Sequence, residues 1–310
     1  MSRTLDAARR SDPEGSAREV DSARARLDEA ILPLGDVLVG AGAPLPLTLS
    51  NSTMGALDRC AGQAVALAGG DRRDPTWAML RGKALDAYVQ HALHVGVVGD
   101  PVEDLRSMWV AEERDEDLAA LEEHLSGDEA GCVSDLASLG SSVEELRALA
   151  AFVARTEQRV DVDVGGVMNL AGRIDVLIGG PGTGHRSMIL EVKSSALRPE
   201  HSAQVRHYVM LTALRQGELP AAAGVWSPGV GVTDVPVNAT LGSSAERVAA
   251  AAVRTAELWA GEAPRLHPGT HCRWCPELDR CPEALHPDSH GDEAWDLHWD
   301  DRWEQDRGER

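Results

Sequence analysis

The sequence is poor in aromatic residues and contains no long apolar run. Aromatic side chains make up 4% of its 310 residues, whereas apolar residues make up 43%. No uncharged stretch approaches the roughly 18 residues of a membrane-spanning helix, and the first thirty residues lack the apolar core of a signal peptide. We therefore expect a globular, cytoplasmic protein without membrane contact that buries a sizeable core.

Basic residues are also in deficit. Thirty Lys and Arg stand against 50 Asp and Glu, so the net charge is -20 at pH 7. A surface of this charge repels a phosphate backbone and excludes broad electrostatic binding of nucleic acid. A local positive field or a bound divalent cation can still create a site for phosphate chemistry. No Gly-rich loop ending in Gly-Lys-Ser/Thr is present, so we expect no helicase activity in the chain itself.

Five cysteines, without a signal peptide, do not suggest a disulfide framework. Three of them, Cys272, Cys275 and Cys281, follow the spacing C-x2-C-x5-C. Three thiolates at this spacing favour a metal site that takes a fourth ligand from elsewhere. Zinc completed by His271 or His286 fits the pattern, and so does an iron–sulfur cluster. Cys132 is not part of the predicted metal site.

The secondary-structure pattern of the sequence changes along the chain and predicts an α/β or α+β fold. Short β-branched segments flanked by helices begin near residue 156, after a mainly helical region. We expect five segments: a disordered tail over 1–17, a helical region with Cys60 over 18–155, an α/β core over 156–262, the cysteine cluster over 263–285 and an acidic helix over 286–310.

Within the helical region, Ser52 or Thr53 is a plausible N-cap for one helix that runs through Cys60. Two further helices are expected over 102–125 and 142–158, with a loop holding Cys132 between them. In the last segment Trp295, Trp299 and Trp303 are spaced to share one helix face. This face packs on the protein's own body or docks a protein partner.

The segments "GRIDVLIGG" and "ILEVKSS" place charged residues on apolar strands. Glu191 and Lys193 alternate with Val192 and therefore project from one face of a strand. If the preceding strand pairs with this one, Asp175 can meet them. Two carboxylates in a polar cleft suit Mg²⁺ or Mn²⁺, and a nearby lysine can orient an attacking water. The alternative is an ordinary ion pair between Glu191 and Lys193 on a solvated sheet, with Asp175 unrelated.

In their order and spacing these residues resemble the PD-(D/E)xK nucleases, and specifically the RecB-type exonucleases. "GRID", "EVK" and the helical "QVRHY" are similar to the motifs of that branch. The resemblance implies a restriction-endonuclease-like core with a mixed sheet flanked by helices. It implies that Asp175, Glu191 and the Val192 carbonyl hold a metal ion, that Lys193 positions the water, and that Gln204 and Tyr208 order the site and the scissile strand.

The resemblance extends to residues outside these motifs. Asp86 in "GKALD" stands where the family carries a metal-assisting histidine, and His91 is a rival for that role. Glu157 stands where the family often has an acid. An upstream cysteine followed by three near the C-terminus looks like the iron–sulfur subgroup that includes AddB and the CRISPR-adaptation nucleases. That likeness implies a [4Fe-4S] cluster on Cys60, Cys272, Cys275 and Cys281, which closes the N-terminal helices onto the core.

We therefore expect a divalent-metal-dependent DNA exonuclease that acts on single-stranded or frayed DNA ends in repair, recombination or defence. Arg173, Arg198 and Arg206 are the expected DNA contacts, together with His201 and His207. Two alternatives remain: a non-catalytic subunit that binds nucleic acid, and a zinc- or iron–sulfur-stapled scaffold that docks a helicase through the tryptophan helix.

Overall fold

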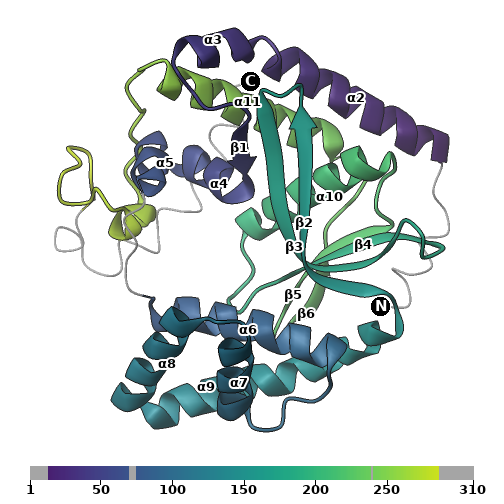
Figure 1. Cartoon of the computed structure of the whole chain (residues 1–310), viewed down its shortest axis with the longest axis vertical. Helices are drawn as coiled ribbons and strands as arrows, with labels where there is room; N and C mark the ends of the chain where they lie inside the picture. The colour runs from purple at the N-terminus through teal and green to yellow at the C-terminus, as the bar shows by residue number, and fades with distance from the viewer. Residues whose placement is uncertain (1–12, 70–74, 239, 286–310) are drawn as a thin grey trace.

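The computed structural model describes residues 13–69, 75–238 and 240–285. Within these residues, six strands form one mixed sheet, with helices on both sides (Figure 1). The strands are β1 (Leu47–Ser50), β2 (Ala154–Val164), β3 (Met168–Gly180), β4 (His185–Val192), β5 (Ala222–Ser227) and β6 (Gly231–Asp234). The predicted α/β fold class is confirmed.

The strands of the sheet follow the order β1-β3-β4-β5-β6. Strands β1 and β4 pair with one edge of β3, and β2 pairs with its opposite edge. The β2–β3 and β3–β4 pairs are antiparallel, whereas β4–β5 and β1–β3 are parallel. Strand β1 lies in the region expected to be helical. The sheet therefore draws on residues from both sides of the expected boundary at residue 155.

The described helices surround this sheet. They are α2 (Pro13–Ile31), α3 (Leu34–Gly40), α4 (Asn51–Arg59), α5 (Ala61–Ala68), α6 (Trp77–His94), α7 (Pro101–Ala111), α8 (Asp115–Gly127), α9 (Glu129–Ser142), α10 (Pro199–Gln216) and α11 (Leu241–Trp259), with the 3₁₀ helices η1 (Val143–Ala151) and η2 (Thr270–Trp274).

Two apolar cores hold the helices on the sheet. The first joins α2, α3, α4, α10 and α11 to the sheet through residues such as Ile31, Met54 and Val209. The second core joins the helices α6, α7, α8, α9 and η1 to the sheet through residues such as Tyr88 and Trp109. In Figure 1 the first group of helices lies in the upper part of the view, around the β2–β3 hairpin, and the second group lies at the bottom of the view. The active-site motifs of the sequence lie where these two cores meet.

Strand β3 changes its partner along one edge. Its residues Met168 to Ala171 pair with β1, and its residues from Val176 onward pair with β4. The four residues between them, Gly172 to Asp175, have no strand partner on that side in the described register. We call this gap, residues 172–175 of β3, the notch. It coincides with the "GRID" motif.

The hairpin also reverses its buried face at the notch. Ile174 packs in the first core, whereas Val176 packs in the second, although residues two apart on a regular strand share a face. On β2 the same change separates Val160 from Ala154. Between them Glu157 has φ 52°, a left-handed backbone that side-chain-bearing residues rarely adopt.

Several sequence expectations are confirmed and others are wrong. The helix expected to carry "QVRHY" is α10, and Gly217 ends it in the left-handed conformation. The helix expected through Cys60 breaks there, because Cys60 adopts an extended backbone between α4 and α5, and the N-cap is Ser50. The loop expected around Cys132 is helix α9. Residues 143–151 form a 3₁₀ helix, and β2 follows where the helix was expected to continue.

Two further expectations concern the ends of the chain. Helix α2 begins at Pro13, so residues 13–17 of the expected tail are helical. The expected tryptophan helix lies outside the described residues. In the part of the chain that the structure describes, no helix combines the length and apolar character needed to cross a membrane.

Gly172 generates a testable prediction, because α10 approaches β3 closely at this residue. A Cβ atom at Gly172 would lie 2.8 Å from the Tyr208 ring and 2.9 Å from Leu211. We expect Gly172→Ala to lower the free energy of unfolding by about 1–3 kcal/mol through overpacking. Urea denaturation measures the change. Gly127→Ala is the control, since no atom lies within 4 Å of its added Cβ; equal losses in both variants would contradict the close approach.

Candidate active site in the notch of the sheet

Asp175 is the last residue of the notch, and its side chain accepts a hydrogen bond that a neighbouring strand would otherwise accept. The ladder between β3 and β4 stops at the pair Val176–Leu190. Beyond that pair, the main-chain N–H of Val192 donates to Asp175 Oδ2 at 2.7 Å. The carboxylate therefore satisfies an amide that the diverging strands leave unpaired, and it is held at the point where β3 and β4 separate.

Glu191 and Lys193 project toward Asp175 from the end of β4. The main-chain N–H of Lys193 donates to the Trp226 carbonyl at 2.9 Å, which extends the pairing with β5 and keeps the strand alternation. The Lys193 ammonium forms an ion pair with Glu191 Oε1. Glu191 is fully buried, and its second oxygen, Oε2, has no hydrogen-bond partner among the described residues. A buried carboxylate oxygen without a partner is costly unless a ligand serves it.

Asp86 faces the same place from α6. Thr76 caps this helix by accepting from the Met79 N–H, and the helix packs on the sheet through its buried residues. Burial raises the pKa of Asp86 to about 7, and the negative charges of Asp175 and Glu157 add to the increase. The structure therefore brings Asp86 into the electrostatic environment of the other predicted residues. His91 lies further along α6, in its last turn.

The carboxylates around the notch outnumber the cations. Burial raises the pKa of Glu191 well above its usual range, and Asp175 adds to this effect. Burial also raises the pKa of Asp175 and of Glu157, although Lys193 and Arg173 respectively oppose it. For Lys193, burial is the largest influence and lowers the pKa, but Glu191 and Asp175 together outweigh it, so its pKa is raised. The ammonium therefore stays charged.

The resulting charge balance fits a divalent cation. Four carboxylates, Asp86, Glu157, Asp175 and Glu191, face two cations, Lys193 and Arg173. With all six groups ionised, two negative charges are left over, which one Mg²⁺ or Mn²⁺ ion would neutralise. The orphaned Glu191 Oε2 is the oxygen that a cation would serve. As they stand, no three or more His, Cys, Asp or Glu side chains of the described residues are arranged around a common metal position.

Gln204 and Tyr208 support the notch from α10. The Gln204 amide donates to the Tyr208 hydroxyl at 2.9 Å, and the main-chain N–H of Arg173 also lies against this hydroxyl. The Tyr208 ring packs where Gly172 leaves space, and only 5% of the residue is exposed. Burial, followed by the charge of Glu191, raises the pKa of Tyr208. Tyr208 therefore stays neutral. Its hydroxyl is the partner of the Arg173 N–H, which a neighbouring strand would otherwise pair with.

The residues expected to contact DNA are placed differently. The Arg173 side chain is 71% exposed and its Nε lies 2.7 Å from Glu157 Oε2. Arg198 is exposed at the start of α10, where its N–H donates to the His201 ring at 3.2 Å. Arg206 is two residues from both Gln204 and Tyr208 and so lies on another face of α10. The expectation for His207 is wrong, because its ring is 2% exposed and contacts the Ala171 carbonyl.

Lys83 is a residue near the site that the sequence reading missed. Its ammonium pairs with Asp117, and Arg114 contacts the same carboxylate at 2.7 Å. It lies one helical turn before Asp86 and therefore on the same face of α6. The chain contains two lysines in total, Lys83 and Lys193. The rarity of lysine was the signal in the sequence, although the Lys83 ammonium pairs with Asp117 and not with a predicted metal-site carboxylate.

The four predicted cluster cysteines converge, although they come from opposite ends of the chain. Cys60 lies in the extended break between α4 and α5, and Cys272 and Cys275 lie in and after η2. Burial raises the pKa of Cys275, and its electrostatic interaction with Cys60, Cys272 and Cys281 raises it further. The Gln63 amide of α5 donates to the His271 carbonyl at 3.3 Å, and α5 and η2 lie side by side in Figure 1. The four cysteines are thus near enough to influence one another, but in the described residues no three of them are arranged around a common metal position.

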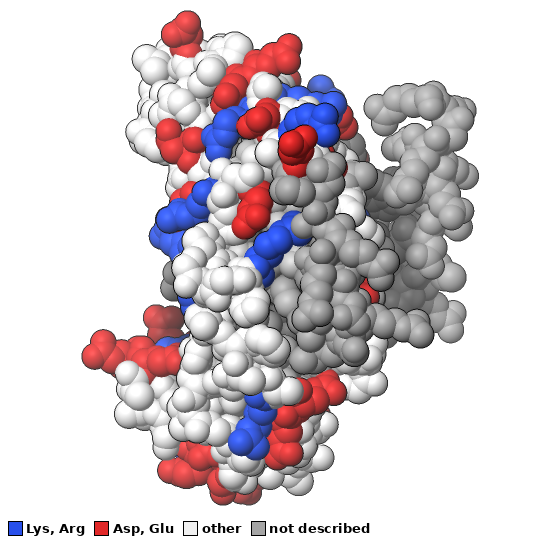
Figure 2. Space-filling view, turned by 90° about the vertical axis from the view of Figure 1, so that its right-hand side faces the viewer, with Lys and Arg blue, Asp and Glu red and all other residues white. Residues whose placement is uncertain are grey.

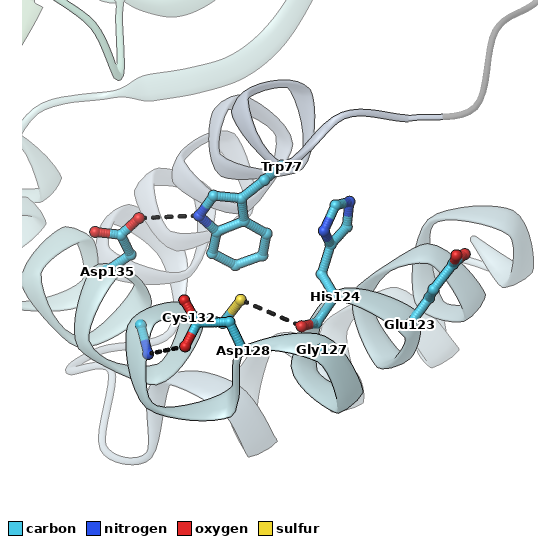
Figure 3. Close-up of a pocket in the computed structure, with 8 residues that line it drawn as sticks. Trp77, Glu123, His124, Gly127, Asp128, Cys132 and Asp135 are labelled. Atoms are coloured by element: carbon cyan, nitrogen blue, oxygen red, sulfur yellow. Dashed lines mark hydrogen bonds between the residues drawn. The ribbon is translucent and has the colours of Figure 1, made fainter.

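Cys132 lies far from these four and belongs to a different feature. It lines a cavity of about 490 Å³ on α6, α8 and α9, together with Trp77, His124 and Asp135 (Figure 3). The Trp77 indole donates to Asp135 at 2.9 Å, and the Cys132 thiol donates to the His124 carbonyl at 3.6 Å. None of the predicted catalytic or cluster residues lines this cavity. Its polar groups have partners within the helical lobe.

Asp86 carries a prediction about pH. The folded protein ionises this carboxyl only near pH 7, whereas an unfolded chain ionises it near pH 4. The folded state is therefore penalised above pH 4, and fully so above pH 7. Without metal, we expect Asp86→Asn to raise the free energy of unfolding at pH 8 by about 1–2 kcal/mol after screening by solvent, with the gain vanishing toward pH 4.

Chemical denaturation in EDTA at pH 8 and at pH 5 measures this gain. Asp21→Asn, on the exposed side of α2, is the control. A loss of stability in Asp86→Asn at pH 8 would show that favourable contacts hold the Asp86 carboxylate and that its charge is balanced.

Comparisons with known proteins identify the family of the chain. A family model described as the PD-(D/E)XK nuclease superfamily matches residues 48–282, which include all of β1 but its first residue, the notch and all four predicted cluster cysteines. No curated protein matches. One solved structure, "Crystal structure of SSO0001", is similar at 16% identity over 76% of this chain and 98% of its own, with a TM-score of 0.33. Residues 48–282 are most of the chain, and the chain therefore belongs to the PD-(D/E)XK nuclease superfamily.

Proposed function

We propose that the protein is a divalent-metal-dependent DNA exonuclease that acts on single-stranded or frayed ends. Membership of the superfamily implies a metal-dependent phosphodiester hydrolase. The observation that carries the assignment of the site is the carboxylate excess in the notch, with the buried and orphaned Glu191 Oε2 at its centre. A role in repair, recombination or defence follows from the motif resemblance.

Asp175, Glu191 and the Val192 carbonyl would hold the metal, with Asp86 as a further ligand. The bound cation would supply Lewis-acid activation of water and neutralise charge on the phosphate. Lys193 remains an ammonium beside Glu191 and is placed to orient the attacking water or to donate to a phosphate oxygen. Hydrolysis breaks one P–O bond and leaves a phosphate monoester and a hydroxyl. Gln204 and Tyr208 keep β3 in position without contacting the reacting atoms.

The acidic composition favours a substrate contact that is local. On the face that Figure 2 shows, Lys and Arg side chains are interspersed with Asp and Glu and form no continuous basic surface. A duplex that lies across a protein needs many phosphate contacts, and each contact strengthens the dependence on salt. A contact with one strand end at the proposed site needs few phosphate contacts. The charge distribution therefore supports strand ends as the substrate.

The cysteine group supports a [4Fe-4S] cluster as the second cofactor, with zinc as the alternative. Cys60 and the C-terminal cysteines lie at opposite ends of the matched segment, so a metal between them closes a long loop. The bound metal would attach α4 and α5 to the end of the core, and its free energy of binding would add to the stability of the fold.

Cleavage of end-labelled single-stranded DNA with Mn²⁺ or Mg²⁺ tests the catalytic proposal. We expect Asp175→Asn, Glu191→Gln and Lys193→Ala each to lower kcat by at least about 100-fold, because each removes a group that binds the metal or acts on the water. Glu246→Gln, in the exposed ion pair with Arg26, is the control. Wild-type protein that binds Mn²⁺ but cuts no DNA would favour the alternative of a non-catalytic binding or helicase-docking subunit.

Iron and acid-labile sulfide analysis of anaerobically purified protein tests the cofactor. We expect about four iron and four sulfide ions per chain. Cys60→Ser should lose most of them and lower Tm by several degrees, because the staple is then incomplete. Cys132→Ser should retain both iron and sulfide, since its thiol lines the cavity on α6, α8 and α9 that contains no other cysteine of the described residues. One equivalent of zinc without iron would establish the zinc alternative instead.

A further inference from the structure

Glu157 holds a backbone conformation that its residue type disfavours. Its φ of 52° lies in the left-handed region, where glycine is the usual residue. The neighbouring pairs Thr156–Val176 and Gln158–Ile174 bracket it, so it stands opposite Asp175. A strained non-glycine residue persists where its surroundings fix it, and such residues concentrate at functional sites.

The strained backbone places the Glu157 carboxylate between the notch and Arg173. Its Oε2 lies 2.7 Å from Arg173 Nε, and the Glu157 side chain is 26% exposed against 71% for Arg173. The acid is therefore on the inner side of this pair and the guanidinium on the outer side. Glu157 is also within electrostatic reach of Asp175 and Asp86.

The ion pair occupies only part of the guanidinium. Because Glu157 contacts Nε, the two terminal nitrogens can contact a second anion. The main chain of Arg173 is fixed as well, since its N–H lies against the Tyr208 hydroxyl. Arg173 is two residues from Asp175, or about 7 Å along an extended strand. Arg173 is thus fixed at its main chain by Tyr208 and at its guanidinium by Glu157. So close to the proposed metal carboxylates, its guanidinium can reach a phosphate next to the scissile one.

The same hairpin provides a comparison. Arg159 is directly opposite Arg173, is also 71% exposed, and pairs with Asp161 at 2.8 Å. Asp161 lies in regular strand pairing with Ala171, the residue just before the notch, and not opposite Asp175 as Glu157 does. The two arginines thus differ in what holds them, not in exposure. Only the pair that includes the strained residue lies beside the metal carboxylates.

We infer that Arg173 binds the phosphate adjacent to the scissile one in a single DNA strand, and that Glu157 is a positioning residue that holds Arg173 there. The inference rests on the proposed nuclease function for its substrate. Glu157 itself contacts neither metal nor DNA in this assignment.

Fluorescence anisotropy of a labelled oligothymidylate in EDTA, over a range of salt concentrations, tests the contact without cleavage. Arg173→Ala should weaken binding about tenfold and reduce the slope of log K against log salt by about 0.7, the value for one phosphate on a single strand. Arg159→Ala should change both by less than twofold. Equal effects of the two arginine variants would overturn the inference.

Glu157 variants separate positioning from catalysis. Glu157→Gln should weaken binding about threefold and raise KM with kcat retained, and the double variant with Arg173→Ala should be no worse than Arg173→Ala alone. Glu157→Gly should show the same binding defect, but a higher Tm than Glu157→Gln because glycine accepts the backbone. If kcat instead falls by about 100-fold or more while KM stays unchanged, Glu157 belongs to the catalytic centre and the positioning role is overturned.

Failure of the proposed function is distinguishable from failure of this inference. Wild-type protein that binds the oligothymidylate with the expected order of variants, but cuts nothing, would contradict the nuclease and support the phosphate contact. Wild-type protein that cuts DNA while Arg173→Ala matches Arg159→Ala in binding would contradict the contact and leave the nuclease standing.

Discussion

The unpaired edge of β3 is the constraint on which the site depends. Strands β1 and β4 pair with the same side of β3 but leave Gly172 to Asp175 between them. The main-chain groups of a broken ladder must be satisfied, and here side chains take the place of a strand. Asp175 accepts from the Val192 N–H, and Tyr208 lies against the Arg173 N–H. The notch therefore fixes a carboxylate and a tyrosine for structural reasons, and the other residues of the proposed site lie around them.

The second consequence is electrostatic. A polar gap between two apolar cores buries charge, and burial raises the pKa of Asp86, Asp175 and Glu191 together. Hydrophobic packing on both sides of the sheet stabilises an arrangement that the carboxylates by themselves oppose. A divalent cation removes that opposition. In the proposed function, this local arrangement would let a chain with a net charge of -20 act on a polyanion.

Local pattern was sufficient to predict part of the site. The alternation in "ILEVKSS" places Glu191 and Lys193 on one face, and the four-residue spacing places Gln204 beside Tyr208. The notch itself was not predictable, because β1 lies some 120 residues before β3 and nothing in "LTLS" indicates its partner. The left-handed Glu157 and the break at Cys60 are set by tertiary packing that overrides local preference, as is the helix around Cys132. His207 was misassigned because a histidine next to a motif tyrosine reads as exposed until the helix face is known.

Diffraction from crystals soaked in Mn²⁺, recorded with anomalous scattering, tests the central claim most directly. The account predicts one strong manganese peak in the notch, coordinated by Asp175, by Glu191 through the oxygen that otherwise lacks a partner, and by the Val192 carbonyl. The peak should disappear in Glu191→Gln crystals soaked in the same way. A manganese ion bound elsewhere with the notch unchanged, or a peak that persists in the variant, would contradict the claim that the buried carboxylate excess is the metal site.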